Sequence, residues 1–549
     1  MTTDSSIPPS RSAINGISPL PTEQWGSRFG LVMAMAGNAI GLGNFLRFPR
    51  LAAEHGGGAF LIPYFIALLL LGIPLMWVEW TMGRHGGQFG HHSTPGMFLR
   101  MTGSRWGKLI GSLGISLPIL FVVFYTYIES WTLAYAFYSI TGAYTTEAVN
   151  LATSEPMMHT RQFLHDYQGV TPEGERVYFQ SLWPAITFWL IAVGLNCWII
   201  SRGVSAGIEK LAKIAMPLLF LFAIVLAIRV LCTGAPDASL PDRSPWVGLN
   251  FVWEPNFMAL AHFDVWLAAA GQIFFTLSIG TGSIQCYASY LKRDDDCAMT
   301  GFATAATNEF AEVVLGGTIA IPLAVSSFGL AATQIIASQG SFDLGFVAMP
   351  LAFEDLPLGW LFATLWFSLL FFAGITSSVG LCMPLAAFLH EAYGIGQKGS
   401  AAICGAFMLV LGLPLVLFLG HGYLDQYDFW VGTFGLALFA FLELICFGWI
   451  FGRHAMWTEL QRGADLKIPR IFYYIIRYIA PAYLLVLLVG WTWESVGKEI
   501  LLEGAPVKDH PYLWLSRGTI AGVVALLGLL VFLWSSNHSI ESEEARGDV

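Results

Sequence analysis

Long apolar runs recur along the whole chain, from near residue 28 to near residue 535, and no other feature restricts the fold so strongly. Of the 549 residues, 55% are hydrophobic and 12% are charged. That charged share is about half of the share in an ordinary soluble protein. The composition therefore excludes a disordered chain and an ordinary soluble multidomain enzyme, and it predicts a protein whose main solvent is lipid.

Twelve of these runs reach the roughly 20 residues that a helix needs to cross a bilayer. In hydrocarbon the backbone groups must be paired inside the protein, and the runs are too long and too uniform for barrel strands. We therefore expect an all-α integral membrane protein with twelve transmembrane helices. They are expected at residues 27–54, 60–84, 107–140, 180–200, 208–232, 262–291, 298–325, 359–391, 400–419, 428–452, 471–493 and 513–535.

The loops between these runs differ in charge on the two sides of the membrane. Fourteen Lys and Arg residues fall in loops on the side of the termini, and seven fall on the opposite side. In membrane proteins the cytoplasmic loops carry the excess of Lys and Arg. We therefore expect both termini in the cytoplasm, and a multi-pass protein in the cytoplasmic (plasma) membrane.

Two of the runs are interrupted by clusters rich in glycine, at residues 37–44 and 278–283. Each glycine costs a helix about 1 kcal/mol relative to alanine. One cluster alone would suit close helix packing equally well. Two clusters five runs apart indicate instead an inverted repeat with a binding site at the membrane midplane. The expected units are a cytoplasmic tail (1–24), a first repeat with outer loops (25–257), a second repeat (258–455), two added helices (456–535) and a second cytoplasmic tail (536–549).

A broken helix leaves backbone groups without helical partners at the middle of the membrane. The exposed N–H groups of one half attract a carboxylate, and the exposed C=O groups of the other half attract an ammonium group or a cation. A zwitterion between two such breaks would find both kinds of partner. The pattern therefore favours an amino acid as the substrate.

Eight short stretches spread along the chain support this interpretation. They are residues 37–49 (GNAIGLGNFLRFP), 56–60 (GGGAF), 72–83 (GIPLMWVEWTMG), 127–133 (YIESWTL), 271–278 (GQIFFTLS), 307–312 (TNEFAE), 371–378 (FFAGITSS) and 428–433 (DFWVGT). Together they closely resemble the neurotransmitter–sodium symporter family, from the first span to the tenth, and the similarity continues through the twelfth. The resemblance implies a 5+5 inverted repeat in which helices 1 and 6 are broken.

The resemblance implies two sodium sites built from oxygen atoms, which suit a hard cation, and no organic cofactor. The first site would use Ala39, Asn44, Thr276 and Asn308 together with the substrate carboxylate. The second would use Gly37, Ile40, Ala373, Thr376 and Ser377. From the residues alone, the asparagines would equally suit hydrogen bonds between helices, and the hydroxyls would equally suit bonds to their own helix backbone.

The resemblance also implies where an amino acid would bind. Its carboxylate would meet the Leu42 and Gly43 N–H groups and the Tyr125 hydroxyl, near Asn38. Its ammonium group would meet the carbonyls of Ala39, Phe275 and Thr276 and the Ser278 hydroxyl. Its side chain would lie among Phe121, Phe275, Thr281, Ser377 and Leu381.

Three positions of this site bear on the choice of substrate. Amine carriers of the family have an aspartate where this chain has Gly41, so a substrate here must bring its own carboxylate. A member that carries leucine has valine and phenylalanine where this chain has Phe121 and Thr281, so the pocket is reshaped. No charged residue is expected to line it, which favours neutral, hydrophobic amino acids.

Glu312 is an ionisable residue inside the seventh span, four residues after Asn308 and on the same helix face. Chloride-dependent members of the family carry a serine at this position and bind chloride beside the first sodium. A glutamate would supply that negative charge covalently, so we expect chloride-independent transport. The alternative is a structural carboxyl group that bonds to the second or sixth span.

Further residues match the gates of the family. Arg47 and Asp428 would close the outer side. On the inner side Trp25, Tyr290 and Glu391 match, but Thr22 stands where an arginine would pair with Glu391. We therefore expect a weaker inner closure, held by a hydrophobic plug.

Other polar residues are given no transport role. Glu79 is expected to accept hydrogen bonds from N–H groups freed at the helix breaks, and Glu129 is expected to be a structural anchor. His91 and His92 are adjacent in a loop and offer no metal-ligand geometry.

The sequence thus predicts a sodium-coupled symporter of neutral amino acids that works by alternating access. An amino-acid sensor on the same fold, without net transport, is the alternative. A channel lacks a selectivity-filter repeat, and an enzyme lacks a catalytic motif. The expected partners are a neutral amino acid, Na⁺ and the bilayer, with a homodimer as one option for assembly. A net charge of −10 gives no surface for nucleic acid.

Overall fold

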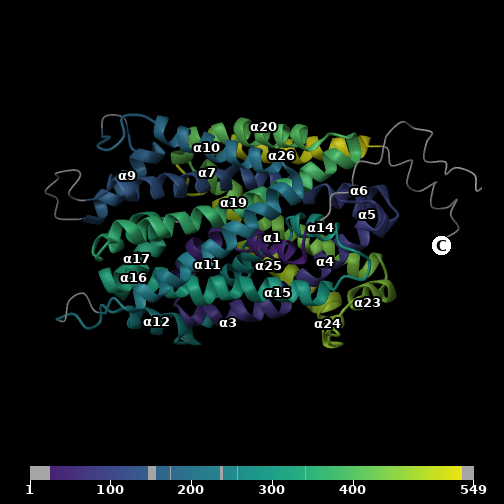
Figure 1. Cartoon of the computed structure of the whole chain (residues 1–549), viewed down its shortest axis with the longest axis horizontal. Coiled ribbons are helices and arrows are strands. Elements are labelled where there is room, and N and C mark those ends of the chain that lie inside the picture. The colour runs from purple at the N-terminus through teal and green to yellow at the C-terminus, as the bar shows by residue number, and fades with distance from the viewer. Residues whose placement is uncertain are drawn as a thin grey trace, which may run out of the picture.

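The computed structural model describes residues 25–145, 156–172, 175–234, 239–255, 257–340 and 342–534. Every regular element in these ranges is helical, as predicted, and most helices follow the long axis of an elongated bundle (Figure 1). The predicted tails at 1–24 and 536–549 lie outside the described residues.

Ten helices in the described part of the chain are long and apolar enough to cross a membrane. They are Gly58–Gly87 (α3 and α4), Arg105–Thr141 (α6 and α7), Trp183–Ile200 (α10), Val204–Leu231 (ending with α11), Cys297–Phe328 (α15 and α16), Gly359–Tyr393 (α19), Gln397–Leu417 (α20), Tyr423–Ile450 (α21 and α22), Ile471–Ser495 (α24 and α25) and Val507–Leu533 (ending with α26). Each corresponds to a predicted helix.

The two remaining predicted spans are the interrupted ones. The first is a pair of helices, Phe29–Ala39 and Gly43–Glu54, bent by 46°. The sixth is α13 (Phe263–Leu277) followed by α14 (Ser283–Ala288), each too short to cross a bilayer alone. The breaks in helices 1 and 6 are therefore confirmed.

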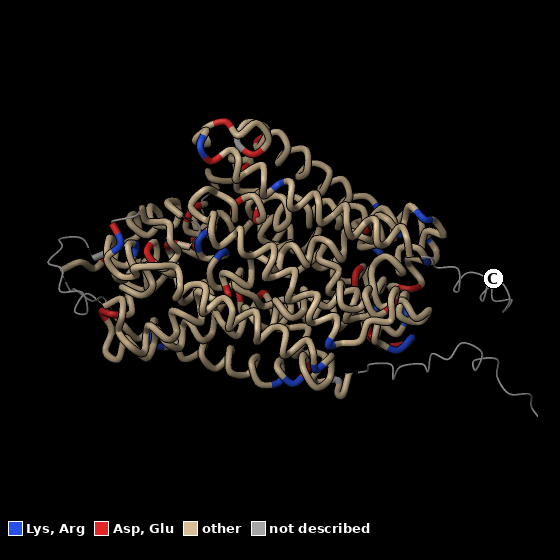
Figure 2. The backbone as a smooth tube through the Cα atoms, turned by 90° about the horizontal axis from the view of Figure 1, so that it is seen from above, with Lys and Arg blue, Asp and Glu red and all other residues tan. Residues whose placement is uncertain are grey.

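Charged residues lie mostly toward the two ends of the bundle, with long uncharged stretches of helix between them (Figure 2). We call the end with α5 (Thr94–Thr102) and α23 (Arg453–Gln461) the inner end, because it is the predicted cytoplasmic side. The opposite end carries α9 (Pro156–Gln168) and α17 (Leu330–Gln339) and is called the outer end (Figure 1).

The predicted outer segments contain helices that the sequence did not indicate. Besides α9 and α17, they include α12 (Pro245–Trp253) and α18 (Met349–Glu354). These helices are too short for a hydropathy signal and depend on local contacts. One such contact is the ion pair between Arg161 Nη2 in α9 and Asp343 Oδ2, at 2.8 Å, which joins two outer segments.

The third, fourth and eighth spans are joined by a buried polar network. Asn196 Nδ2 donates to Glu129 Oε1 at 3.1 Å, and Ser378 Oγ donates to Asn196 Oδ1 at 2.7 Å. All three side chains are fully buried. These bonds link three helices through buried side chains, as expected for Glu129, although its second oxygen, Oε2, has no hydrogen-bond partner in the described chain.

Arg84, at the inner end of α4, is fully buried and holds two inner loops. Its guanidinium donates to the carbonyl oxygens of Asp295 at 2.7 Å, Arg462 at 2.8 Å and Glu459 at 2.5 Å. It also lies 3.6 Å from the Glu459 carboxylate. The loops after α14 and α23 thus close around one cation.

Replacing Arg84 by glutamine should lower the free energy of unfolding by about 3 kcal/mol or more, because it breaks a buried pair and leaves carbonyl groups unpaired. Thermal unfolding of the purified protein, followed by tryptophan fluorescence, would measure the loss. Arg105 is exposed at the same end of the bundle, so Arg105→Gln is the matched control. Equal shifts in the two variants would contradict the assigned role.

Candidate functional site

The first helix break exposes backbone groups in the protein interior. Helix α1 (Arg28–Ala39) ends where Ile40 adopts an extended conformation, with φ −78° and ψ 97°, and helical geometry resumes at Gly43. The freed Gly41 N–H donates to Asn44 Oδ1 at 2.8 Å, and the freed Leu42 N–H donates to the Tyr125 hydroxyl at 2.8 Å. Side chains therefore take the place of helical partners.

The second break lies between α13 and α14 and depends on left-handed backbone. Ser278, Gly280 and Gly282 have φ values of 54°, 74° and 75°. A Cβ atom on either glycine would also run into backbone of a neighbouring span. The freed Gly280 N–H donates to Glu79 Oε1 at 2.8 Å, as predicted for that carboxyl group.

The two breaks meet inside the bundle. The Ser278 hydroxyl donates to the Asn38 carbonyl oxygen at 2.8 Å, and Asn38 Nδ2 donates to Ser283 Oγ at 3.1 Å. Asn38 and Ser283 are almost or fully buried, and Ser278 is 9% exposed. The unwound segments of the first and sixth spans are thus in direct contact, as the inverted-repeat pattern requires.

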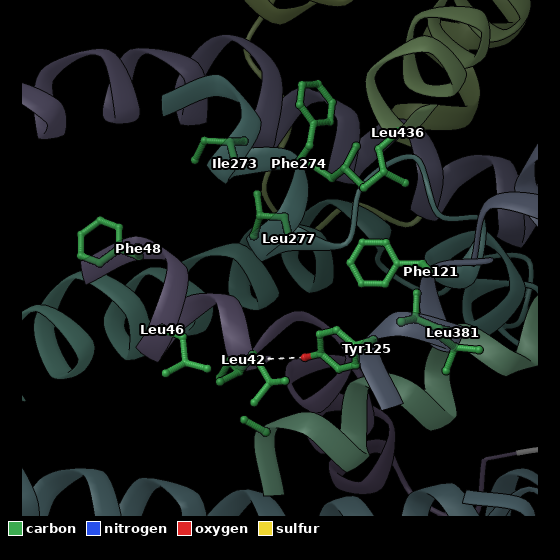
Figure 3. Packing of buried hydrophobic residues seen from close by; sticks show 14 of the residues in the cluster. Leu42, Leu46, Phe48, Phe121, Tyr125, Ile273, Phe274, Leu277, Leu381 and Leu436 are labelled. Carbon is green, nitrogen blue, oxygen red and sulfur yellow. Dashed lines mark hydrogen bonds between the residues drawn. The ribbon is translucent and has the colours of Figure 1, made fainter. Parts of the chain in front are cut away.

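A small cavity of about 10 Å³ lies at this junction, room for about one water molecule. It is lined by Ala39, Gly41, Gly43, Asn44, Phe121, Tyr125, Phe275, Ser278, Thr281, Ser377, Leu381 and Leu436. Nine of the twelve residues predicted to bind substrate are in this lining. The other three, Asn38, Leu42 and Thr276, adjoin it through the breaks. Figure 3 shows Phe121 and Leu381 near the hydrogen bond between Leu42 and Tyr125.

Glycine is required at position 41 for steric reasons. A Cβ atom there would lie 2.5 Å from the Tyr125 hydroxyl oxygen and 3.0 Å from Ser377 Oγ. Contacts below 3.0 Å force neighbouring atoms to move. The site therefore leaves no space for a side chain between the first break, Tyr125 and Ser377.

Aromatic rings separate this cavity from a second one toward the outer end. The ring centroids of Phe121 and Phe275 are 5.3 Å apart, and those of Phe121 and Tyr125 are 5.6 Å apart. Tyr125 and Phe275 line both cavities. The outer cavity has a volume of about 60 Å³, and its lining includes Arg47 and Asp428.

The predicted outer gate pair is close but not joined. Within the described chain Arg47 and Asp428 form no ion pair within 4.0 Å. The Arg47 guanidinium instead lies 4.5 Å from the Phe275 ring centroid and donates to Thr433 Oγ1 at 3.4 Å. The outer cavity lies between the two charges, so the structure brings the predicted partners to one cavity without closing it.

The four residues predicted for the first sodium site converge on one point. One terminal atom of the Asn308 amide lies 2.8 Å from Asn44 Nδ2. The same atom is 3.2 Å from the Ala39 carbonyl oxygen and 3.3 Å from the Thr276 carbonyl oxygen. Oxygen atoms from both breaks and from the seventh span are thereby gathered in the buried interior.

The residues predicted for the second sodium site are also gathered, at the contact of the first and eighth spans. Ser377 Oγ donates to the Gly37 carbonyl oxygen at 3.1 Å. Thr376 packs against Gly37, but its hydroxyl donates to its own helix, at Phe372 O (2.8 Å) and Ala373 O (3.3 Å). Ile40, in the break itself, is fully buried. The hydroxyl of Thr376 therefore has the local bond that the sequence left as an alternative.

Glu312 is fully buried beside the first predicted sodium site. Its carboxyl group accepts a hydrogen bond from Gln272 Nε2 at 3.0 Å, and it lies 2.9 Å from Tyr64 Oη, whose single proton is shared with Glu309 Oε2 at 2.7 Å. It also accepts a bond from the hydroxyl of Thr276. A carboxyl group is thus held next to Thr276, one of the residues whose oxygens converge.

Comparison with known proteins shows which family has this arrangement of broken helices. The sequence profile of the Sodium:neurotransmitter symporter family matches residues 22–235 and 158–498. The chain belongs to this family. An uncharacterized sodium-dependent transporter of Methanocaldococcus jannaschii is 28% identical over 470 residues, which cover 85% of this chain and 90% of that protein. The human sodium- and chloride-dependent neutral and basic amino acid transporter B(0+) is 25% identical over 523 residues, covering 85% and 79% of the two chains.

The fold is shared with a solved transporter. The crystal structure of MhsT in complex with L-phenylalanine superimposes with a TM-score of 0.72 at 28% identity, and the match covers 85% of this chain and 99% of that one. The fold expected from the sequence, with its broken helices, is therefore confirmed. The symporter family consists of sodium-dependent membrane transporters, so the chain is a transporter rather than an enzyme.

The inner residues of this symporter differ from the sequence expectation. Trp25 lies against Tyr287, which was not among the expected gate residues, with ring centroids 5.4 Å apart. Glu391 is not left without a partner by the absence of an arginine, because His91 Nδ1 lies 2.7 Å from its carboxylate. A polar contact therefore adds to the aromatic one, and the weaker inner closure stays a prediction. The loop that supplies His91 is 300 residues away in sequence, so the local pattern could not indicate the contact.

Three residues of the site were not predicted. Leu436 lines the small cavity, and Tyr64 and Gln272 bond to Glu312. Gln272 had a signal, because it is a polar residue in an apolar helix, one turn before Thr276. Tyr64 and Leu436 had none, since a tyrosine or leucine in an apolar run is most often ordinary packing.

Proposed function

We propose that this chain is a sodium-coupled symporter of neutral amino acids that works by alternating access and does not need chloride. The observation that carries the proposal is the contact of the two unwound segments, where Ser278 Oγ reaches the Asn38 carbonyl at 2.8 Å. At such a junction a zwitterion can meet N–H groups of one break and carbonyl oxygens of the other.

Two groups of oxygen atoms support sodium coupling. At the first, an amide atom of Asn308 lies within 3.3 Å of two carbonyl oxygens. The hydrogen-bond partners assign this atom as the amide nitrogen, which donates to both carbonyl oxygens; turning the amide over would present its oxygen to a cation instead. Sodium would therefore order Ala39, Asn44, Thr276 and Asn308 around the substrate carboxylate. At the second group, sodium would draw the Thr376 hydroxyl away from its own helix.

Glu312 supports independence from chloride. Its carboxyl group contacts Gln272, Thr276 and Tyr64, and Thr276 in turn bonds to Asn308, so an ionised Glu312 would place a negative charge beside the first sodium group. The similar human transporter is described as sodium- and chloride-dependent. A carboxylate that cannot leave would supply the same compensating charge without an ion from solution.

The cavity lining supports a neutral, hydrophobic substrate. None of its residues is charged, and Phe121, Phe275 and Leu381 offer apolar surface. The similar transporter MhsT was solved with L-phenylalanine. A cavity of about 10 Å³ cannot hold an amino acid, so the Phe121 and Phe275 rings would have to move apart as it enters. Alternating access provides such movements.

Uptake into proteoliposomes would test the proposal. A neutral amino acid such as phenylalanine should accumulate inside only with an inward sodium gradient, and replacing chloride by gluconate should leave the rate unchanged. Binding without accumulation would favour an amino-acid sensor, and loss of uptake without chloride would reject chloride independence. Competition by the twenty amino acids would define the substrate.

Placement in the cell is part of the proposal. We infer both termini in the cytoplasm and a multi-pass protein of the bacterial cytoplasmic membrane, from the excess of Lys and Arg in the loops of the inner end. We also infer repeats at 25–257 and 258–455. A homodimer would be tested by native mass spectrometry.

A further inference from the structure

The carboxylate of Glu391, at the inner end of α19, is held by a loop that joins α4 to α5. Four groups surround it: His91 Nδ1 at 2.7 Å, His92 N–H at 3.1 Å, Ser93 N–H at 3.0 Å and Ser93 Oγ at 2.7 Å. An ionised carboxylate can only accept hydrogen bonds, so His91 donates through Nδ1. The loop is thereby fixed to the eighth span.

His92, the next residue of the same loop, contacts the sixth span. His92 Nδ1 lies 2.9 Å from Ser289 Oγ, and its ring stacks on Tyr290 with centroids 4.6 Å apart. The Ser289 hydroxyl gives its only proton to the Cys286 carbonyl at 2.6 Å, so His92 donates. Ser289 and Tyr290 directly follow α14, the inner half of the broken sixth span.

A second carboxylate holds the inner half of the broken first span. Glu209 precedes α11, and its side chain is 2% exposed. Its oxygens accept from Gly26 N–H at 2.7 Å and from Ser27 Oγ at 2.9 Å. Ser27 is the residue that caps α1. Lys213 Nζ lies 2.7 Å from the same carboxylate and balances its charge.

We propose that two carboxylate latches close the inner side of this transporter, one for each broken span. The Glu391 latch acts through His91 and His92 on the sixth span, and the Glu209 latch acts directly on the start of the first span. The proposal rests on the proposed function, because a latch matters only if the inner halves move. It assigns the inner closure to Glu209, His91 and His92.

The geometry favours latches over permanent struts. The Glu209 bonds join the inner half of the first span directly to the segment before α11, and the loop of His91 and His92 joins the inner half of the sixth span to the eighth span. Both links cross the boundary where alternating access needs motion. The bonds are few, and they lie at the inner end rather than in the packed middle of the bundle. Such contacts can break together and shift a two-state equilibrium by several-fold.

Distance measurements between spin labels would test the latches. One pair, at Arg293 and Lys398, reports on the sixth span; another, at Val32 and Lys398, reports on the first span. Arg293, Lys398 and Val32 are exposed. The background would carry serine at the two cysteines that are not buried, Cys232 and Cys197. Wild-type protein in sodium buffer should show mainly the short distance.

Removing a latch should raise the long-distance population about three- to tenfold, as expected for the loss of one or two hydrogen bonds. Glu391→Ala and His92→Gly should affect the sixth-span pair, and Glu209→Ala should affect the first-span pair. Lys210→Gln is the control for Glu209, because it removes an exposed cation beside the latch and leaves Lys213 and the carboxylate bonds in place; it should have little effect. An effect equal to that of Glu209→Ala would overturn the Glu209 latch.

The latches and the proposed function can fail separately. Binding of labelled phenylalanine, uptake and thermal stability would be measured on the same variants. Unchanged distances in folded variants that bind substrate would reject the latches and leave the symporter intact. A wild-type protein without binding or uptake, whose latch variants still shift the distances, would reject the proposed function and keep the latches.

The Glu391 latch should weaken in acid. Burial lowers the pKa of His92, and this outweighs the neighbouring Glu391 carboxylate, while His91 and His390 act in the same direction as burial. Released His92 would titrate near the ordinary value of about 6.5. The neutral form therefore favours the latched state above that pH, and its advantage is lost as the pH falls through the lowered pKa. The long sixth-span distance should grow between pH 7.5 and pH 5.5, and His92→Asn should abolish this dependence.

Discussion

Replacing Glu312 by serine is expected to lower sodium-driven uptake about 100-fold in chloride-free medium and to restore it when chloride is added. The substitution removes the buried carboxyl group that accepts from the Thr276 hydroxyl, and Thr276 is also bonded to Asn308. Leaving a buried charge without its partner typically costs about 3–5 kcal/mol, which exceeds a factor of 100. Chloride could enter the space vacated by the carboxylate, where Tyr64, Gln272 and Thr276 supply the donors.

Glu309 provides a matched control for this experiment. It is another carboxylate one turn earlier on the same helix, and it shares the Tyr64 hydroxyl, at 2.7 Å. Glu309→Gln should remain independent of chloride. If Glu312→Ser transports equally well with and without chloride, Glu312 does not compensate the sodium charge. If Glu309→Gln becomes chloride-dependent, Glu309 and Glu312 together compensate the sodium charge.

Tyr125→Phe is expected to weaken binding of a neutral amino acid about 10- to 100-fold at saturating sodium. The hydroxyl of Tyr125 accepts the Leu42 N–H at 2.8 Å, and we propose that it also meets the substrate carboxylate. Its loss removes a hydrogen bond to a charged group, worth about 1.5–3 kcal/mol. It also leaves the Leu42 N–H without a side-chain acceptor. Equilibrium binding of labelled phenylalanine would measure the effect.

Tyr127→Phe is the matched control, because Tyr127 lies on the same helix and is equally buried, and its hydroxyl has no hydrogen-bond partner within the described chain. Its removal should change binding less than threefold. Similar losses in both variants, together with a lower thermal midpoint, would point to helix packing instead of substrate contact. Unchanged binding in Tyr125→Phe would place the carboxylate elsewhere.

Much of the fold could be predicted because the bilayer imposes simple rules. Uniform apolar runs predicted the spans, and the glycines at 280 and 282 predicted the second break. Both glycines have left-handed backbone in the structure, which glycine adopts readily. The outer helices α9, α12, α17 and α18 escaped notice, because short helices outside the membrane lack a strong hydropathy signal. Their positions depend on contacts such as Arg161 with Asp343.

The site could be predicted where a motif carried it and not where distant loops completed it. Asn44, Thr276 and Asn308 lie in stretches with strong family resemblance, and they do converge. The partners of Glu391 could not be predicted, because they lie in the loop after α4, about 300 residues away in sequence. Because Thr22 stands at the arginine position, the sequence indicated that no arginine pairs with Glu391 there. No sequence pattern indicated that His91 contacts this carboxylate instead.

The close contacts around Gly41 also affect how mutation could change the substrate class of this transporter. An aspartate there would in principle accept amines that lack a carboxylate. Yet a Cβ atom at this point already collides with the Tyr125 hydroxyl, 2.5 Å away, and crowds Ser377. An aspartate at this position would therefore have to displace the Tyr125 hydroxyl, which accepts the Leu42 N–H, so a change of substrate class would also disturb the first helix break.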